Sequence, residues 1–350
     1  MKKNLILLIC LAMALAGCKQ QPLTLLIGTY TAEGSEGIYR CEIDPATGEP
    51  TQPQAVVKAD NPSYLALSEG GQLLYAVSEG HQSALNVYRY NAATDSFSLH
   101  STKPTLSPGP CYVALFGGYA YTANYTGGSL TAFPLLEDGS LGEPMLAEYS
   151  DEQHISHIHG VFPAPDGQSI YVTDLGRSEI FQVEPPLKEL SRVALSEGAG
   201  PRHMAFSKDG ASAYALNELS GTVAVFDVAE DGLHLKQEIA SDSVGGGGSA
   251  DIHLSPDGKY LYTSNRLKAD GISIFSVDSD NGTLTKVSYT DTGIHPRNFV
   301  LTPDGEFLLC AERDSDCIEI FSRNSQTGEL TPTGHKIELS MPVCLKWMNK

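Results

Sequence analysis

The sequence predicts an all-β protein, a seven-bladed β-propeller with four antiparallel strands in each blade, and three observations support this fold. A segment of similar pattern recurs six times along the 350 residues. Pro62 and the matching Pro342 lie 280 residues apart, so six repeats give a period of about 47. Apolar residues alternate within each repeat, which is typical of strands. The two chain ends carry the strands of one further, divided repeat.

The repeats begin at residues 61, 109, 157, 200, 249 and 295. Each is expected to contain an inner strand A, a tight turn, strand B, a loop, strand C and a weaker outer strand D, as a propeller blade does. The turn between strands A and B is S-P-D-G or a variant, as in Ser255 to Gly258. Turn formation explains the Asp of this motif without a calcium site. An aromatic residue lies near the end of strand C in Phe226, Phe275 and Phe321.

The seventh blade is expected to combine both ends of the chain. The segment PVCLKWM, residues 342–348, has the pattern of a strand A with no blade after it. The segment TLLIGTYTAEGSEGIYRCEID, residues 24–44, has the pattern of strands B and C with no strand A before them. Pairing these segments closes the ring and removes the exposed edges of an open array.

The N-terminal segment MKKNLILLICLAMALAGC has the pattern of a bacterial lipoprotein signal, with two Lys, an apolar run and small residues before a Cys. We expect residues 1–17 to be a signal peptide, Cys18 to carry lipid, residues 18–23 to be a linker and residues 24–350 to form a single propeller domain. The apolar run is too short to span a bilayer. The expected location is therefore the cell envelope, lipid-anchored and facing the periplasm or the cell surface.

Charge and cysteine content narrow the classes of partner and site. The formal net charge is −19, which makes nucleic acid and anionic membrane surfaces poor partners for the body of the protein. Five cysteines follow Cys18, an odd number that excludes a complete disulfide framework. A bridge between Cys310 and Cys317 is conceivable, but buried free thiols are favoured. No zinc-binding spacing of cysteines occurs.

In an up-and-down blade, the residues before strand A and after strand B lie on the same face of the disc. Arg202 and Arg297 precede strand A, and Glu218, Arg266 and Arg313 follow strand B. We expect them to surround one mouth of the central channel, together with Arg177 and with His157, His159, His203, His295, Asn124, Asn217 and Asn265. Arg binds carboxylates or phosphates and stabilises an oxyanion, and a neighbouring carboxylate or imidazole can activate water. For any single Arg the alternative is a surface ion pair, such as Arg313 with Asp314.

Two further motifs have weaker interpretations. His154, His157 and His159 allow a zinc pair, but no third ligand has a fixed spacing, so we expect no metal. The run Gly245 to Gly248 precedes a strand A, where it is either a backbone nest for an anion or, more simply, a flexible connection.

The segments GPRHMAFSKDG, LSPDGKYLYTSNR and HPRNFVLTPDGEFLLCAERDSD, with LLIGTYT and SHIHGVFPAPDG, resemble the lactonase family of seven-bladed β-propellers. That family includes a bacterial 6-phosphogluconolactonase and a fungal carboxymuconate cyclase, and the resemblance extends from about residue 24 to 347. It implies a catalytic set of one His (His157 or His159), Arg202, Glu218 and Arg266. The remaining expected substrate-binding residues are Arg297, His203, Asn217, Asn265, Arg313 and Asn124.

The expected function is hydrolysis of a sugar-type, anionic lactone by a 6-phosphogluconolactonase-like enzyme that needs no cofactor and acts as a monomer. An exported protein would meet a sugar or uronic-acid lactone rather than a cytoplasmic phosphorylated one. No G-x-S-x-G motif is present, so we expect direct attack by water, with Glu218 or His159 accepting its proton. The alternatives are a non-catalytic propeller that binds a ligand or protein at the same mouth, and a metal-dependent lactonase.

Overall fold

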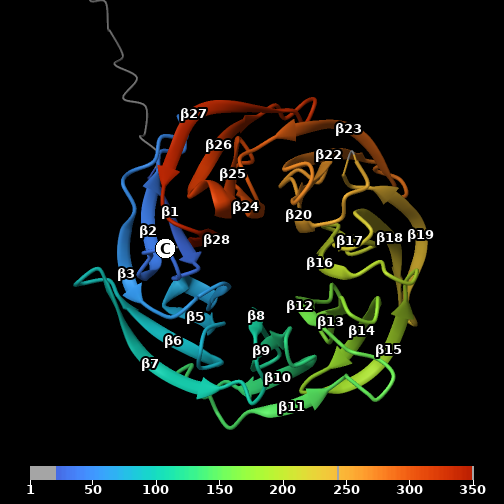
Figure 1. Cartoon of the computed structure of the whole chain (residues 1–350), viewed down its shortest axis with the longest axis horizontal. Coiled ribbons are helices and arrows are strands. Elements are labelled where there is room, and N and C mark those ends of the chain that lie inside the picture. Colours follow the sequence, from blue (N-terminus) through green and yellow to red (C-terminus); the bar gives the residue numbers. More distant parts are fainter. Residues whose placement is uncertain (1–20, 243, 349–350) are drawn as a thin grey trace, which may run out of the picture.

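The computed structural model describes residues 21–242 and 244–348, which form seven four-stranded antiparallel sheets arranged in a ring (Figure 1). From the innermost to the outermost strand, blade 1 contains β4 (Leu65–Leu67), β5 (Leu73–Ser78), β6 (Ala84–Asn91) and β7 (Ser96–Pro104). Blade 2 contains β8 (Pro110–Phe116), β9 (Tyr119–Asn124), β10 (Ser129–Pro134) and β11 (Met145–Glu148). Blade 3 contains β12 (Ile158–Pro163), β13 (Ile170–Asp174), β14 (Glu179–Glu184) and β15 (Lys188–Ala194).

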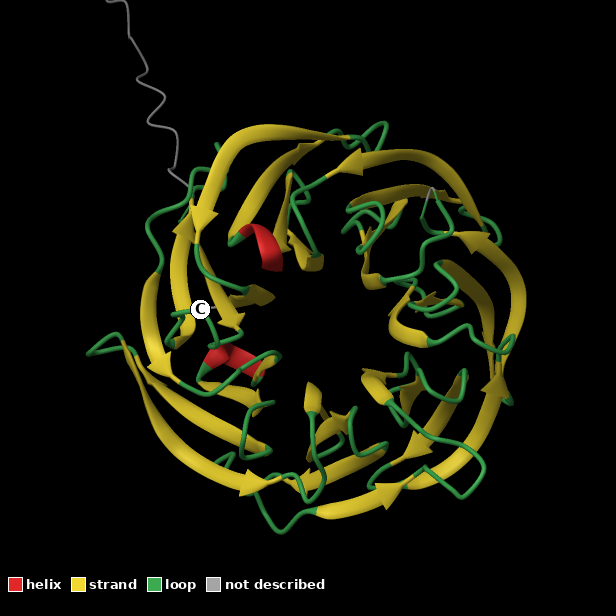
Figure 2. Ribbon diagram, in the orientation of Figure 1, coloured by secondary structure: helices red, strands yellow, loops and turns green. Residues whose placement is uncertain are grey.

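The remaining blades follow the same order. Blade 4 contains β16 (Pro201–Phe206), β17 (Ser212–Asn217), β18 (Thr222–Ala229) and β19 (Gly232–Ala240). Blade 5 contains β20 (Ser249–Leu254), β21 (Tyr260–Asn265), β22 (Gly271–Val277) and β23 (Leu284–Asp291). Blade 6 contains β24 (Pro296–Leu301), β25 (Phe307–Glu312), β26 (Cys317–Arg323) and β27 (Leu330–Glu338). Within the described residues the only helical segments are two 3₁₀ turns, Glu69–Gly71 and Arg313–Ser315 (Figure 2).

Blade 7 confirms the predicted closure of the ring. It contains β28 (Pro342–Met348), β1 (Leu23–Thr29), β2 (Gly37–Ile43) and β3 (Gln54–Lys58), with the C-terminal strand innermost. Strands β28 and β1 pair antiparallel, with Leu345 opposite Ile27 (Figure 1). The chain ends therefore fasten the ring through backbone hydrogen bonds, and blade 7 has four strands like the other six.

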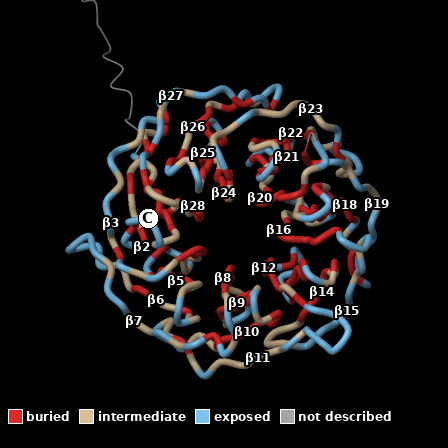
Figure 3. Tube along the Cα trace, in the orientation of Figure 1, coloured by how far each residue is buried: buried red, intermediate tan, exposed pale blue. Residues whose placement is uncertain are grey.

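The core lies between neighbouring blades, where strand B is almost continuously buried and the outer strand is largely exposed (Figure 3). The aromatic residues predicted in strand C are fully buried, Phe226, Phe275 and Phe321 among them. Tyrosine hydroxyls link the blades: Tyr75, Tyr214 and Tyr262 donate to carbonyl oxygens of the next blade at 2.7–2.9 Å. All five cysteines within the described residues are buried free thiols, as predicted.

One hydrogen bond recurs in every blade and sets the geometry of the mouth. The residue after strand B donates its backbone N–H to the carbonyl of the residue before strand A. The seven pairs are Tyr30 to Met341, Glu79 to Asn61, Tyr125 to Gly109, Leu175 to His157, Glu218 to Gly200, Arg266 to Gly248 and Arg313 to His295. Six of the seven acceptor residues, all except His157, have left-handed φ values between 44° and 86°. The predicted convergence of these positions on one face is therefore confirmed.

A β-bulge follows in six of the blades. The pairing of strands A and B shifts between Pro110 and Tyr112, Ile158 and Gly160, Pro201 and His203, Ser249 and Ile252, Pro296 and Asn298, and Pro342 and Cys344. The bulged positions include Cys111, His159, Arg202 and Arg297. A bulge re-aims the side chain of its extra residue, and these side chains belong to the wall of the channel at the mouth.

The predicted signal peptide, Cys18 with its predicted lipid, and residues 18–20 of the predicted linker lie outside the described residues. Among the residues that are described, no helix has the length and apolarity needed to cross a membrane.

Candidate active site

A carboxylate that bridges two guanidinium groups forms the centre of the mouth. Glu218 Oε2 lies 2.9 Å from Arg202 Nε, and its Oε1 lies 3.1 Å from Arg266 Nη2. The Arg202 N–H does not point along the line to the carboxylate, so this contact is an ion pair rather than a directed hydrogen bond. Burial favours the protonated form of Glu218, but Arg266, Arg202 and Arg297 outweigh it and lower the pKa of the carboxyl. Glu218 is therefore ionised.

The two guanidinium groups are held by backbone carbonyls as well as by Glu218. Arg202 Nη1 donates to Ala250 O in blade 5, and Arg266 Nε donates to Gly248 O at 2.8 Å. Both side chains are at least 95% buried, with exposed fractions of 3% and 5%. Fixed, desolvated guanidinium groups are the arrangement that stabilises negative charge as it develops on a substrate.

The buried carboxylate of Asp251 supports Arg202 through His203. Asp251 was not among the site residues expected from the sequence. Asp251 Oδ1 accepts from His203 Nδ1 at 2.7 Å, so the other nitrogen, Nε2, has a lone pair for Arg202 Nη1 at 3.2 Å. Asp251 Oδ2 also accepts from His253 Nε2, from Asn298 Nδ2 and from the backbone N–H of Phe299. Asp251 thus connects three blades. Asp251 occupies the same position in its repeat as His203 and Asn298 do in theirs, and this is the sequence feature that could have identified it.

Arg297 lies against Tyr30, with its guanidinium carbon 5.3 Å from the centre of the ring. The Tyr30 hydroxyl donates to Glu79 Oε2 at 3.1 Å. Tyr30 and Glu79 were also missed from the sequence, although both follow a strand B as Glu218 and Arg266 do. The mouth is therefore lined from at least four blades.

The structure separates the two histidines between which the sequence could not choose. His159 is 5% exposed and its ring lies 5.3 Å from that of His203. Burial and the charges of Arg202, His203, Arg297 and Arg266 hold the pKa of His159 well below its ordinary value, so the imidazole is neutral. Its Nδ1 is buried without a hydrogen-bond partner. His157 instead stacks on Tyr125 and bonds the carbonyl of that residue at 3.0 Å.

The three asparagines expected to bind substrate lie inside their own blades. Asn124 donates to Ser129 Oγ and Thr131 Oγ1, and Asn217 donates to Thr222 Oγ1. Asn265 accepts from Ser241 Oγ and Ser249 Oγ. These side-chain amides are already hydrogen-bonded within the protein, where they hold strands together, and are therefore less available to bind a substrate. Arg313 forms the ion pair with Asp314 that the sequence offered as its alternative.

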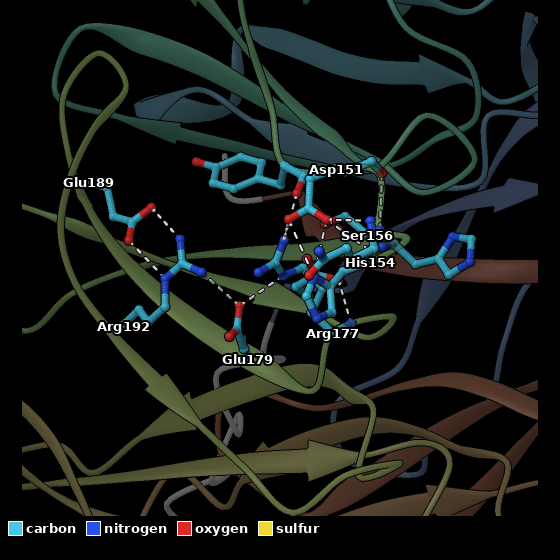
Figure 4. Close-up of polar contacts among 12 residues, drawn as sticks. Asp151, His154, Ser156, Arg177, Glu179, Glu189 and Arg192 are labelled. Atoms are coloured by element: carbon cyan, nitrogen blue, oxygen red, sulfur yellow. Dashed lines mark hydrogen bonds and ion pairs between the residues drawn. The ribbon is translucent and has the colours of Figure 1, made fainter.

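Arg177 does not join the Glu218 cluster. It forms ion pairs with Asp151 and Glu179, each at 3.0 Å, and Glu179 also pairs with Arg192 (Figure 4). His154 lies beside Asp151 in the same network, at 3.1 Å. This network ties the loop before blade 3 to strands β14 and β15. The expectation that Arg177 converges with the other arginines was wrong, because nearer carboxylates compete for it.

Neither weaker motif provides an open ligand site. In the described part of the chain, no three His, Cys, Asp or Glu residues are grouped as metal ligands would be. The N–H groups of Val244, Gly245, Gly246 and Gly247 all donate to the carboxylate of Asp242. The backbone nest therefore exists, but the protein fills it with its own anion.

The larger cavities lie away from these residues. One of about 770 Å³ opens between blades 3 and 4, one of about 550 Å³ lies beside the outer ends of β1 and β28, and one of about 410 Å³ opens between blades 4 and 5. The first and the third are lined by the turns that join strands A and B, on the face opposite the mouth. The Gln182 amide and the Lys236 amine beside them are already hydrogen-bonded, so the chemistry is better assigned to the mouth.

The buried histidines predict that stability decreases in acid. Burial and the charge of Arg202 lower the pKa of His203 to about 4. Between about pH 6.5 and 4 the unfolded chain binds a proton at this residue that the folded protein does not, so stability falls with pH there. His159 and His295 act in the same direction. Glu312, whose pKa burial raises to about 7, acts in the opposite direction between about pH 4.5 and 7.

The free energy of unfolding of the wild type should fall between pH 7 and pH 4.5. In His203→Asn this fall should be smaller by about 2 kcal/mol. Urea titrations at the two pH values measure this loss. The exposed His234 provides the control His234→Asn, which should leave most of the loss in place. An unchanged loss in His203→Asn would show that this imidazole is not held neutral by the fold.

The comparisons with known proteins agree with this fold. The family described as lactonase, seven-bladed β-propeller, matches residues 24–347. A 6-phosphogluconolactonase of Bacillus subtilis is 29% identical over 342 residues, covering 93% of this chain and 98% of the relative. A Bacteroides fragilis protein provisionally named a 6-phosphogluconolactonase has a crystal structure with a TM-score of 0.89 and 42% identity, covering 95% of this chain and 99% of that one. The periplasmic gluconolactonase PpgL of Pseudomonas aeruginosa has a TM-score of 0.89 and 31% identity, covering 94% and 99%.

Proposed function

Because the chain belongs to the lactonase family of seven-bladed β-propellers, we propose that it hydrolyses a sugar-type lactone at the mouth formed by Arg202, Glu218, Arg266 and His159. The observation that carries this proposal is the pair of buried guanidinium groups fixed by one carboxylate beside a neutral imidazole. Relatives named as lactonases of phosphogluconate and gluconate support the substrate class. We propose that the substrate carries an acidic group, because the arginines at the mouth can bind a carboxylate or a phosphate.

In the proposed reaction, water adds to the lactone carbonyl carbon while Arg202 and Arg266 stabilise the negative charge that forms on the carbonyl oxygen. The imidazole of His159 accepts a proton from the attacking water and returns it to the ring oxygen as the C–O bond breaks. The products are a hydroxyl group and a carboxylic acid on the same open chain. The attacking group is water itself, as the missing nucleophile motif indicates.

Glu218 is a weaker candidate than His159 for the proton acceptor. Both of its oxygens lie within 3.1 Å of a guanidinium nitrogen, and its pKa is lowered. The two arginines stabilise the ionised form of this carboxylate, so it is a weak base and binds a proton poorly. Its role is to hold the two arginines at a fixed separation.

The substitution His159→Gln should lower kcat for lactone hydrolysis about 10²-fold or more with little change in KM, because the proton acceptor is lost while the arginines remain. His234→Gln, on the outer strand β19, is the control and should match the wild type. Should Glu218→Gln abolish turnover while His159→Gln retains it, the proton acceptor would be Glu218. Chelation by EDTA should leave turnover unchanged, whereas a metal-dependent lactonase would lose it.

We further propose that the protein is attached to the membrane through lipid on Cys18. Strand β1 begins at Leu23, on the face opposite the mouth, since its other end, Thr29, precedes Tyr30 at the mouth. A tether from Cys18 to this strand would leave the mouth directed away from the membrane. Cys18→Ser should move the protein from the membrane fraction to the soluble fraction, whereas Cys10→Ser should not. A membrane-bound Cys18→Ser variant would contradict lipid attachment at this residue.

A further inference from the structure

Both guanidinium groups that contact Glu218 also contact an imidazole. Arg202 Nη1 lies 3.2 Å from His203 Nε2, and Arg266 Nη1 lies 3.3 Å from His295 Nε2. The side chains of these two pairs are at most 9% exposed. His203 belongs to the network that supports Arg202, whereas the proposed mechanism gives His295 no part.

The ring of His295 is held so that Nε2 accepts a hydrogen bond from Arg266. A guanidinium group has donors only, so the ring nitrogen that faces it must carry the lone pair. The other nitrogen, Nδ1, lies 3.4 Å from Asp314 Oδ2, which favours the ring proton on Nδ1. Burial and the charges of Arg266 and Arg313 lower the pKa of His295 to about 3, so the imidazole is neutral.

The backbone of His295 is fixed as well as its ring. Its N–H donates to Asp270 Oδ1 at 2.9 Å, and its carbonyl accepts from the N–H of Arg313 at 3.1 Å. Its φ is 63°, a left-handed conformation that a residue with a Cβ keeps only where its surroundings hold it. Arg266 and Asp270 are the two ends of the loop between β21 and β22 in blade 5. His295, which precedes β24 in the neighbouring blade 6 (Figure 1), therefore contacts both ends of that loop.

We propose that His295 is a positioning residue, which holds the guanidinium group of Arg266 in the direction it needs to stabilise the carbonyl oxygen of the lactone. This role rests on the proposed function of the mouth. A neutral acceptor fixes the direction of a guanidinium group without cancelling its charge, whereas a second carboxylate in contact would cancel it and weaken the stabilisation of the oxyanion. His295 contacts neither the attacking water nor the substrate in this role and acts only through Arg266.

Two substitutions of His295 separate the acceptor from the rest of the side chain. His295→Leu removes the acceptor and should lower kcat for lactone hydrolysis about 10-fold or more with little change in KM, because the direction of the donor matters where the charge develops. His295→Gln offers an amide oxygen near the place of Nε2 and should retain most of kcat. Both variants keep a side chain at the same left-handed φ, so backbone strain does not distinguish them.

His100 provides the control for the loss of a contact between His and Arg. Its Nε2 lies 3.0 Å from Arg89 Nη2 on the outer strands of blade 1. His100→Leu should therefore leave kcat and KM at the wild-type values. Equal kcat in His295→Leu and the wild type, or an equal loss in His295→Leu and His295→Gln, would overturn the proposal.

A double-mutant cycle tests whether His295 acts through Arg266. In the Arg266→Met background, His295→Leu should cause no further loss of kcat/KM, because no guanidinium group is left to position. A second loss as large as the one in the wild-type background would contradict a role through Arg266.

Crystal structures of the wild type and the two His295 variants test the positioning without reference to activity. The guanidinium group of Arg266 should shift by about 1 Å or more in His295→Leu and stay in place in His295→Gln. An unmoved guanidinium group in His295→Leu would overturn the proposal. A wild type that hydrolyses no lactone would overturn the proposed function instead, and a shifted Arg266 would then still show that His295 positions it.

Discussion

Replacing Arg202 with Met is expected to lower kcat/KM for lactone hydrolysis by about 10²- to 10³-fold, the loss typical of removing one fixed donor from an oxyanion site. Met retains most of the apolar volume of the side chain and removes its donors to Ala250 and His203. Glu218 keeps Arg266 as a partner, so the fold should survive. Steady-state kinetics on the folded protein measure the change.

Arg323 provides the matched control for this experiment. It is 2% exposed and pairs with Asp257 at 3.1 Å, but it lies at the turns of the opposite face. Arg323→Met should cost stability and leave kcat/KM of the folded enzyme within about twofold, because it contributes no donor at the mouth. A similar loss of activity in both variants would mean that Arg202 acts through the fold rather than on the substrate.

Replacing Asp251 with Ala is expected to lower the free energy of unfolding by about 3–5 kcal/mol. The carboxylate is buried and accepts hydrogen bonds from His203, His253 and Asn298, so its removal leaves the buried donors of His203 and Asn298 without an acceptor. It also disconnects blades 4, 5 and 6 at their inner strands. Urea unfolding followed by fluorescence or circular dichroism measures the loss.

The control for Asp251 is another Asp that pairs with a His on the surface. Asp231 lies 2.7 Å from His234, and both side chains are more than half exposed. Asp231→Ala should change stability very little, because solvent screens the pair and replaces its hydrogen bond. Loss of less than about 1 kcal/mol in Asp251→Ala would show that the buried network can rearrange around a smaller side chain.

The sequence predicts most of the fold because each blade repeats the same local physics. A period of about 47 residues and the alternation of apolar residues located the blades, and the S-P-D-G turns and their variants marked the inner hairpins of several of them. The divided blade followed from the unmatched strands at the two ends, and β28 pairs with β1 as required. The recurring bond between the residues after strand B and before strand A explains why Glu218 and Arg266 could be placed at one mouth from repeat position alone.

The partners of the site residues could not be predicted in the same way. Repeat position places Asp251, Glu79 and Tyr30 near the mouth, but only the structure shows that Asp251 bonds the side chains of His203, His253 and Asn298. Arg177 lies in the loop after strand B of blade 3, and there Asp151 and Glu179 pair with it. The choice of His159 over His157 depended on a bulge and on stacking against Tyr125, neither of which has a clear sequence signal.

The most direct test of the central claim is to measure the hydrolysis of a panel of sugar lactones, with and without phosphate or carboxylate groups. The quantity measured is the rate of acid release above the spontaneous rate. The account predicts turnover by the wild type, with anionic lactones preferred over neutral ones, and loss of that turnover in Arg202→Met. If no lactone is hydrolysed above the spontaneous rate while the wild type still binds sugar acids at the mouth, the protein is a binding propeller and the catalytic account is wrong.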